Sequence, residues 1–370
     1  MRVLMVSKAC VVGTYQTKLE ELARLPDMDL TVVVPSSWRD ERGELALERV
    51  HTEGYNLVQT PIALNGHFHL HFYPRLGALV RRFSPQVLHV DEEPYNLAAF
   101  QAIRLARRAG ARTITFTWQN LLRRYPPPFS WIEAYNLRHT DHALVGNRDA
   151  AAVLRAKGFA GPVTMVPQFG VDPAVFCPRE ASHSVRGEGA FGIGYVGRLV
   201  EEKGVEMLLR AAPDLSAEGG WRLHLIGSGP LERHLRRLAV ELGIGDRVHF
   251  EGQVVSTEMP ARLRLLDALI LPSRTRPNWK EQFGRVLVEA MASGVPVIGS
   301  DSGEIPHVIG DAGLIFPEGN VEALRHQLAR LMADADLRAA LAARGRARVL
   351  AHYTQARIAE ATYAAYQQTL

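Results

Sequence analysis

Cysteine is scarce in this chain of 370 residues, which contains only Cys10 and Cys177. Two cysteines cannot form a disulfide framework, so a small disulfide-stabilised fold is excluded and two ordinary thiols in a reducing compartment are expected. Long apolar runs are also missing, since no stretch provides the roughly 18 consecutive apolar residues of a transmembrane helix. The start, MRVLMVSKAC, has too short an apolar run for a signal peptide and predicts a buried first strand. These absences predict a soluble, cytoplasmic protein.

The composition has no extreme that would remove the chain from the globular class. Hydrophobic residues make up 47% and charged residues 22% of the sequence. These fractions exclude a disordered, collagen-like or coiled-coil chain. The length is too great for one ordinary core and suits two domains of roughly 150 to 200 residues each.

Excess positive charge is confined to the N-terminal half. Residues 1–175 hold 20 basic and 16 acidic residues, whereas 176–370 hold 23 of each. The excess gathers in 75–157, with arginine pairs at 81–82, 107–108 and 123–124. It fits a patch that meets an anionic membrane surface, and it fits solvated helix faces equally well. Nucleic-acid binding is not expected, because no recognition motif accompanies the charge.

Short apolar runs alternate with amphipathic helical stretches, first in VLMVS, TKLEELARL and LTVVVP, and again after residue 190 in GIGYVG, VEMLLRAA and WRLHLIG. This alternation predicts βαβ units and two α/β domains with parallel sheets. Pro, Ser and Gly interrupt the pattern between them. We therefore expect an N-terminal domain over 1–173, a linker over 174–190, a C-terminal domain over 191–345, and a helical tail over 346–370 that packs back on the N-terminal domain.

The segment GIGYVG at 192–197 spells the G-x-G-x-x-G of dinucleotide-binding proteins. In that fingerprint the glycines follow a strand, whereas here Ile193, Tyr195 and Val196 form an apolar run that predicts the strand itself. The next predicted strand also ends without an acidic residue for a ribose. A nicotinamide or flavin cofactor is therefore not expected.

Two cations follow this predicted strand, Arg198 directly and Lys203 five residues later. Cations at the carboxyl end of a parallel strand suit a diphosphate, because arginine offers a planar fork and lysine a mobile point charge. A solvent-facing loop is the alternative. A glycine turn at Gly227 ends the next strand, where backbone amides can approach a ligand.

The most informative segment is 281–300, EQFGRVLVEAMASGVPVIGS. Glu281 and Glu289 stand eight residues apart, and Phe283-Gly284 open a predicted apolar helix. A glutamate in such a helix is costly to bury unless it is paired. Ribose hydroxyls would pair with it, because a carboxylate accepts two hydrogen bonds side by side. The amides after Gly284 would point from a helix N-terminus toward an anion or a sugar oxygen.

A set of motifs keeps its order and spacing throughout 190–317: Gly197-Arg198-Leu199, Lys203-Gly204, Phe250-x-Gly252, LPSR, Glu281-x-Phe283-Gly284 through Glu289, and Gly294-x-Pro296-Val297. In these motifs the chain resembles the retaining family-4 glycosyltransferases, with their Glu-x7-Glu motif. The resemblance implies an α/β chain of GT-B fold, with two Rossmann-like doubly wound domains facing a central cleft. It also implies a nucleotide-sugar substrate, no cofactor and no bound metal.

Carried over by position, the resemblance implies that Arg198 and Lys203 hold the diphosphate and Glu289 the ribose. Glu281 would face the transferred sugar and would form the catalytic group with the two cations. The implied donor-binding positions are Gly13, Gly197, Arg198, Lys203, Gly227, Phe283, Gly284, Val286, Leu287 and Glu289.

The resemblance is looser in the N-terminal half, where LHVDEEP at 88–94, GNRDA at 146–150 and VPQFGVDP at 166–173 carry it. Gly13 is a single glycine where many relatives have two. Thr117-Trp118-Gln119 stands where an acceptor-side histidine is often found, and Gln168-Phe169-Gly170 replaces the usual asparagine-glycine. We therefore expect an unusual acceptor pocket. Its expected residues are Asp91, Glu92, Trp118 and Gln119.

Three polar groups have two interpretations each. The acidic run 91–93 follows a predicted strand, so it could orient an acceptor or form a solvated acidic loop. The histidines at 67, 69 and 71 alternate like metal ligands, but no carboxylate accompanies them and an exposed polar strand edge is favoured. Asp334-x-Asp336 matches the D-x-D of metal-dependent transferases, although it lies in an alanine-rich helical tail and is interpreted as a coincidence.

The sequence thus predicts a metal-independent, retaining hexosyltransferase that moves a sugar from a nucleoside diphosphate to an acceptor hydroxyl in surface polysaccharide or glycolipid assembly. Stabilising the charge of the leaving diphosphate would be its main task. The expected partners are a nucleotide-sugar donor, a glycan or lipid-linked acceptor and, if the basic excess is functional, the inner face of an anionic membrane. A sugar-nucleotide epimerase of GT-B architecture and a non-catalytic nucleotide-sugar-binding subunit are the alternatives.

Overall fold

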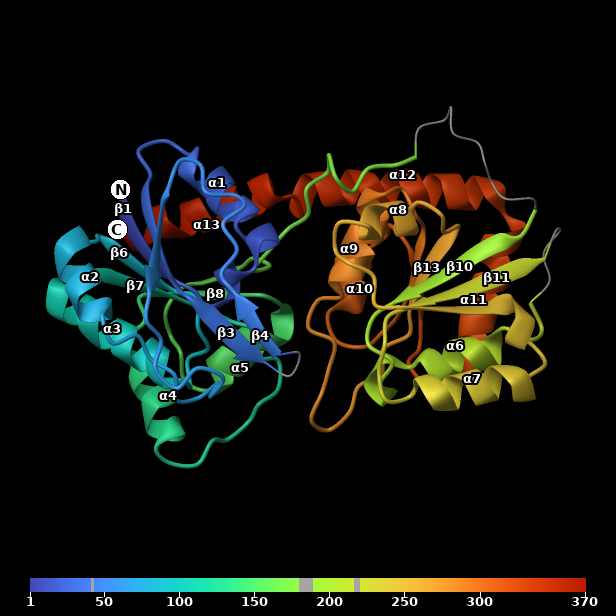
Figure 1. Ribbon diagram of the computed structural model, residues 1–370, viewed down its shortest axis with the longest axis horizontal. Helices are drawn as coiled ribbons and strands as arrows, with labels where there is room; N and C mark the ends of the chain where they lie inside the picture. Colours follow the sequence, from blue (N-terminus) through green and yellow to red (C-terminus); the bar gives the residue numbers. More distant parts are fainter. Residues whose placement is uncertain (41–42, 180–188, 216–219) are drawn as a thin grey trace. The chain divides into compact units, whose positions relative to one another are not determined.

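The computed structural model describes residues 1–40, 43–179, 189–215 and 220–370 (Figure 1). It divides into two compact units, Met1–Gly170 with Gln355–Leu370, and Val171–Thr354. The chain returns to the first unit at Gln355, beyond the start of the predicted tail at 346. Much of the predicted linker, namely 180–188, lies outside the described residues.

Seven parallel strands form the sheet of the first unit, in the order β5-β2-β1-β6-β7-β8-β9. They are β1 (Arg2–Val6), β2 (Asp29–Pro35), β5 (Asn56–Thr60), β6 (Val87–Val90), β7 (Arg112–Thr117), β8 (His142–Val145) and β9 (Val163–Met165). An antiparallel ribbon of β3 (Ser37–Asp40) and β4 (Gly43–Ala46) follows β2. The predicted buried first strand is confirmed as β1.

Helices cover both faces of this sheet, which is why its central strands are apolar on both sides. They are α1 (Thr17–Ala23), α2 (Leu76–Phe83), α3 (Leu97–Ala109), α4 (Phe129–Arg138), α5 (Arg148–Ala156) and α13 (Gln355–Thr369). Val3 and Met5 of β1 belong to the core cluster with α1 and α13, whereas Leu4 and Val6 belong to the cluster with α2 and α3. Figure 1 shows these two pairs of helices on opposite sides of the sheet. The last helix is thus part of the first unit's core.

Six parallel strands form the sheet of the second unit, in the order β12-β11-β10-β13-β14-β15. They are β10 (Phe191–Val196), β11 (Trp221–Ile226), β12 (Val248–Gly252), β13 (Ala268–Leu271), β14 (Val297–Ser300) and β15 (Leu314–Phe316). The segment GIGYVG lies mostly within β10, so the prediction that it forms the strand is confirmed.

Helices again lie on both faces of this second sheet, with α6, α7 and α11 on one side and α9 and α12 on the other (Figure 1). The helices of this unit are α6 (Val205–Ala211), α7 (Glu232–Glu241), α8 (Met259–Leu263), α9 (Arg285–Ala292), α10 (Ile305–Ile309), α11 (Val321–Ala333) and α12 (Ala335–His352). Across the described ranges of both units, no helix has the length and apolar character needed to cross a membrane.

Each sheet has one place where neighbouring strands lead the chain away in opposite directions. It lies between β1 and β6 in the first sheet and between β10 and β13 in the second. In doubly wound sheets, ligands bind outside the carboxyl ends of the strands at such a switch point. The fold therefore directs attention to the residues that immediately follow these four strands.

Candidate functional site

Three polar side chains meet beside the switch point of the second sheet. The Lys203 Nζ lies 2.6 Å from a carboxylate oxygen of Glu281, and the Ser273 hydroxyl donates to the same oxygen at 2.8 Å. Glu281 and Ser273 are buried, whereas the Lys203 side chain is 21% exposed. Because the ammonium group stays partly open, it can meet a second anion without losing Glu281. The structure thus brings together two of the three predicted catalytic residues.

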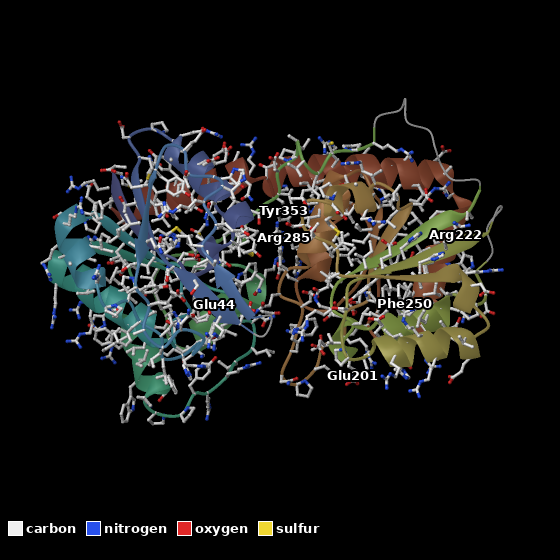
Figure 2. All side chains as sticks on the ribbon, viewed as in Figure 1. Glu44, Glu201, Arg222, Phe250, Arg285 and Tyr353 are labelled. Atoms are coloured by element: carbon white, nitrogen blue, oxygen red, sulfur yellow. The ribbon has the colours of Figure 1, made fainter. Side chains whose placement is uncertain are left out.

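A tryptophan borders this ion pair. The Lys203 Nζ lies 4.8 Å from the ring centre of Trp279, within the range of a cation–π contact. The ring is held by a tight turn, in which the Arg276 amide donates to the Trp279 carbonyl at 2.7 Å. Arg276 also forms an ion pair with Glu201, which is labelled in Figure 2. Trp279 was not predicted as a site residue, because nothing in the sequence of the β13–α9 loop singles it out.

The predicted glycines after β10 and β11 allow a close approach of two backbone segments. Gly197 and Gly227 have φ of +155° and +136°, and a Cβ on Gly227 would lie 2.0 Å from the Gly197 carbonyl oxygen. Only glycine fits there. Arg198 follows this turn as an exposed residue, and its carbonyl oxygen accepts a hydrogen bond from the Tyr195 hydroxyl at 2.7 Å. The turn therefore sets the third predicted catalytic residue at the carboxyl edge of the sheet.

Helix α9 begins directly after Gly284, as predicted, and Gly284 takes the left-handed conformation with φ of +76°. The amino end of a helix favours anions, because its first amides lack partners within the helix. Phe283 is buried edge-on against Tyr353, with ring centres 5.7 Å apart. Val286 is half-buried, whereas Leu287 is fully buried and its amide donates to the Gly284 carbonyl. Leu287 therefore belongs to the core, and its side chain is not available to a donor.

Glu289 lies one turn further along α9 and is paired with Arg285, which Figure 2 labels. The Arg285 Nε donates to one carboxylate oxygen at 2.8 Å. Burial raises the pKa of Glu289, and the Arg285 guanidinium opposes this shift. The Glu289 side chain is 13% exposed. A carboxylate that accepts one internal hydrogen bond retains capacity for a hydroxyl donor.

The predicted donor glycine of the first unit, Gly13, is occupied by its own chain. Its amide donates to a carboxylate oxygen of Glu48 at 2.5 Å. A Cβ on Gly13 would lie 2.7 Å from the Val50 side chain. An incoming anion would have to displace Glu48 from this amide. The loop that follows β4 therefore controls access to Gly13.

The predicted acidic residues of the first unit are buried, so the interpretation as a solvated acidic loop is wrong for Asp91 and Glu92. Asp91 accepts hydrogen bonds from the Ser7 hydroxyl at 2.6 Å and from the Gln168 amide at 2.9 Å. Burial raises the pKa of Asp91, and the nearby Lys18 ammonium lowers it. Lys18 is itself buried and donates to the Gln168 carbonyl at 3.0 Å. These residues hold the switch point together.

Glu92 has charged partners as well as a hydrogen-bond donor. It forms an ion pair with Lys8 and accepts a hydrogen bond from the Tyr73 hydroxyl at 3.0 Å. Burial would raise the pKa of Glu92, but the charges of Lys8 and His71 outweigh it and lower the pKa to about 2. His71 is fully buried with its Nε2 3.4 Å from Glu92. The prediction of an exposed polar strand edge at the three histidines is therefore wrong for His71, because a turn carries it into this cluster.

The two remaining residues predicted for the acceptor side, Trp118 and Gln119, also contact other residues of the first unit. The Trp118 indole donates to the Gln168 side chain at 2.9 Å, and its amide donates to Glu93 at the same distance. Gln119 is buried, and in the amide orientation that suits both neighbours it donates to Glu133 at 3.2 Å and accepts from Lys157 at 2.8 Å, which bridges a second ion pair. Both residues support the carboxyl edge of the sheet. The Asp334 side chain caps α12, which is a structural role for half of the D-x-D sequence.

Two family profiles cover most of the chain. Residues 180–348 match the family described as glycosyl transferases group 1, and residues 12–168 match the glycosyl transferase 4-like domain. A GDP-mannose-dependent alpha-(1-6)-phosphatidylinositol monomannoside mannosyltransferase of Mycolicibacterium smegmatis is 32% identical over 361 residues, which cover 90% of this chain and 89% of that relative. This chain is a family-4 glycosyltransferase.

The glycosyltransferase is also similar to the enzyme of the same description from Mycobacterium tuberculosis, with 37% identity over 161 residues. That match spans less than half of the relative, 42% of each chain. Among solved structures, HepE of Anabaena in complex with UDP superposes with a TM-score of 0.75 at 17% identity and complete coverage of both chains. Sucrose-phosphate synthase of Thermosynechococcus elongatus gives 0.73 at 20% identity, over 99% of this chain and 98% of that one. The two Rossmann-like halves thus form a GT-B fold.

Proposed function

We propose that the glycosyltransferase is a retaining hexosyltransferase that moves a hexose from a nucleoside diphosphate to an acceptor hydroxyl. The observation that carries this proposal is the cluster of Lys203, Ser273 and Glu281 beside the switch point, with Arg198 at the same edge. Cations at this place meet the need of a leaving diphosphate, on which negative charge develops as the glycosidic bond breaks.

The proposed division of work follows from the contacts. Lys203 and Arg198 stabilise the leaving diphosphate, and the amino end of α9 adds its partial positive charge. Glu281, oriented by the Lys203 and Ser273 hydrogen bonds, faces the transferred hexose. Glu289 accepts hydrogen bonds from the ribose. In retention, the departing phosphate oxygen takes the acceptor proton on the face that the acceptor hydroxyl attacks. No cofactor enters this scheme, and the protein's own cations replace a metal ion.

The proposed pathway is glycolipid or surface polysaccharide assembly. The mycobacterial relatives are described as GDP-mannose-dependent enzymes that act on a phosphatidylinositol monomannoside, and the HepE structure holds UDP. These descriptions support a nucleoside-diphosphate donor and a glycan or lipid-linked acceptor for this chain. GDP and UDP are the two nucleoside diphosphates to test first.

The first experiment separates donor binding from the other proposals. Thermal unfolding of the full chain is measured with UDP, GDP, ADP and dTDP, because a ligand that binds only the native state raises its stability by mass action. We expect one nucleoside diphosphate to raise the unfolding temperature, and Glu289→Ala to reduce that rise. No stabilisation by any of the four would contradict the donor site.

The second experiment concerns the reaction. The matching nucleotide hexose is incubated with the enzyme, with and without acceptor extracts, and products are followed by NMR. Transfer with an unchanged anomeric configuration supports the proposal, whereas conversion of the donor to an epimer without acceptor would favour the epimerase alternative. Complete absence of hydrolysis or transfer would favour a non-catalytic binding subunit. We expect transfer to survive excess EDTA. Loss with EDTA and recovery with Mg²⁺ or Mn²⁺ would contradict the metal-independent scheme.

We also propose that the enzyme works at the inner face of a membrane through the basic surface of its first unit. Arg123 and Arg124 are exposed beside Leu122, which is 61% exposed, and Trp131 is 69% exposed. Basic and apolar side chains together favour an anionic lipid surface. Charge reversal at Arg123 and Arg124 should reduce sedimentation with phosphatidylglycerol vesicles, while reversal of Arg236 in the second unit serves as control. Unchanged sedimentation of the first variant would contradict this localisation.

A further inference from the structure

Five ring-bearing side chains gather at the carboxyl edge of the first sheet, and the proposed reaction scheme uses none of them. They come from the segments that follow β5, β6 and β7, and the last of them begins α4: Phe68, His69, Tyr95, Tyr125 and Phe129. We call them the ring cluster. Three segments that are separate in sequence thus bring aromatic side chains together next to the β1/β6 switch point, where the fold favours a ligand.

The rings contact one another closely, and their planes are inclined to one another. The ring centres of Tyr95 and Tyr125 are 4.4 Å apart with an inclination of 30°. His69 lies 5.4 Å from Tyr95 at 37° and 5.1 Å from Phe129 at 60°. The pairs are in direct contact and inclined, so they do not form two parallel walls that could hold a flat base between them. A ligand would have to pack against the cluster from outside.

The ring cluster is also incompletely buried. Phe68 is 38% exposed, and the other four rings are half-buried. Half-buried aromatic rings beside polar groups are typical of small-molecule sites, which combine apolar contact area with a few oriented hydrogen-bonding groups. The cluster therefore has ring area to offer to a ligand.

The polar groups at its border narrow the class of ligand. Tyr125 lies under the Lys157 ammonium, 5.1 Å from its ring centre, and Lys157 is paired with Glu133 at 2.5 Å, with each side chain 10% exposed. The Lys8 ammonium lies 4.7 Å from the Phe68 ring centre. Two resident cations disfavour a cationic ligand, and an acyl chain would cover the part of the ion pair that remains exposed without offering it a hydrogen bond. A polyhydroxylated ring satisfies both the rings and the polar border.

We propose that the ring cluster binds the acceptor through the C–H face of a six-membered polyhydroxylated ring, a pyranose or a cyclitol. One face of such a ring is apolar and packs on an aromatic side chain, while its equatorial hydroxyls reach the Lys157–Glu133 pair. This inference rests on the proposed transferase function and adds the acceptor's chemical class. The contacts that it names differ from the predicted acceptor residues Asp91, Glu92, Trp118 and Gln119, whose polar groups make hydrogen bonds or ion pairs within the first unit.

The test uses the full chain and saturation-transfer NMR. The probes are methyl α-mannopyranoside, methyl α-glucopyranoside and myo-inositol, with the linear polyol mannitol as the comparison. We expect a saturation-transfer signal on the ring C–H protons of at least one cyclic probe and no such signal on mannitol. Phe129→Leu keeps apolar volume but removes the ring. It should lower the affinity for that probe about two- to tenfold, the scale of one lost aromatic contact. Tyr95→Ala should lower the affinity at least as much.

A matched control comes from the same helix as Phe129. Tyr135 of α4 packs on Phe100 and His139, away from the ring cluster. Tyr135→Ala should leave the cyclic probe unaffected. An equal saturation-transfer signal on mannitol would overturn the inference, and so would unchanged binding of the cyclic probe by both cluster variants. The thermal stabilisation by nucleoside diphosphates is measured in parallel on every variant. It distinguishes loss of the donor site or of the fold from loss of the ring cluster.

Discussion

Replacement of Lys203 by methionine is the sharpest test of the catalytic assignment. The change keeps an unbranched side chain of nearly the same length while removing the ammonium group that pairs with Glu281 and lies over the Trp279 ring. Two effects follow from the structure, one on stability in the absence of donor and one on turnover in its presence. They have different origins and are measured separately.

The stability effect is limited by exposure. Removing one partner of a fully buried ion pair costs about 3–5 kcal/mol. Here the Lys203 side chain is 21% exposed, and the Ser273 hydroxyl still donates to Glu281. We therefore expect a loss of about 1–3 kcal/mol, less than for a fully buried pair. The turnover effect is larger, because loss of one preorganised electrostatic group costs roughly 10²- to 10³-fold.

The assay measures urea unfolding without ligand and the turnover number at saturating donor. Arg210→Met is the control, because Arg210 pairs with Glu206 on the surface, where both side chains are at least 40% exposed. It should change stability by less than about 1 kcal/mol and leave turnover unchanged. Lys203→Arg, which keeps the charge, should retain more turnover than Lys203→Met. If Lys203→Met turns over within about fivefold of the native enzyme, Lys203 does not stabilise the leaving diphosphate.

Three further predictions use the other carboxylates. Glu289→Ala should mainly raise the donor KM and Glu281→Ala should mainly lower kcat, because one meets the ribose and the other the reacting hexose; equal effects on both constants would contradict this division. Because burial raises the pKa of Glu289 and Arg285 opposes this, donor affinity measured by calorimetry should fall as the pH drops through that pKa. In Arg285→Leu the fall should begin at higher pH, and an unshifted profile would refute the pairing. Glu92, with its pKa lowered to about 2, contributes stability that is present above its ordinary pKa of 4.5 and is lost as the pH falls toward 2. Lys8→Met should therefore cost on the order of 1–3 kcal/mol in urea unfolding at pH 7 and less at pH 3; an equal cost at both pH values would argue against the ion pair.

Much of the donor side could be predicted from local sequence patterns. The strand β10, the helix start after Gly284 and the glycines at 197 and 227 depend on residues close together in the chain, where apolar periodicity and backbone sterics act directly. The pairing of Lys203 with Glu281 joins residues 78 positions apart. The motif order placed both residues in one domain, but only the meeting of β10 and β13 brings them into contact.

The acceptor side was predicted less well, because its residues are brought together by the fold rather than by spacing. Asp91 and Glu92 read as polar residues in a loop, and nothing adjacent to them in sequence reveals the buried lysine and histidine that hold them. The five members of the ring cluster are spread over 68–129, each unremarkable in its own segment. Their proximity depends on parallel strands ending at one edge.

By itself, the sequence determined the α/β fold class and the residue types that follow the strands of the donor unit, because alternating apolar patterns and glycine requirements act over a few residues. Its motifs, in their order and spacing, carried the resemblance to the family-4 glycosyltransferases and with it the GT-B fold. Only the tertiary structure decided which charges are paired and which remain open. Burial and Coulomb interaction depend on distance in space, and Glu48 on the Gly13 amide or Lys8 on Glu92 are contacts between segments that the chain keeps far apart.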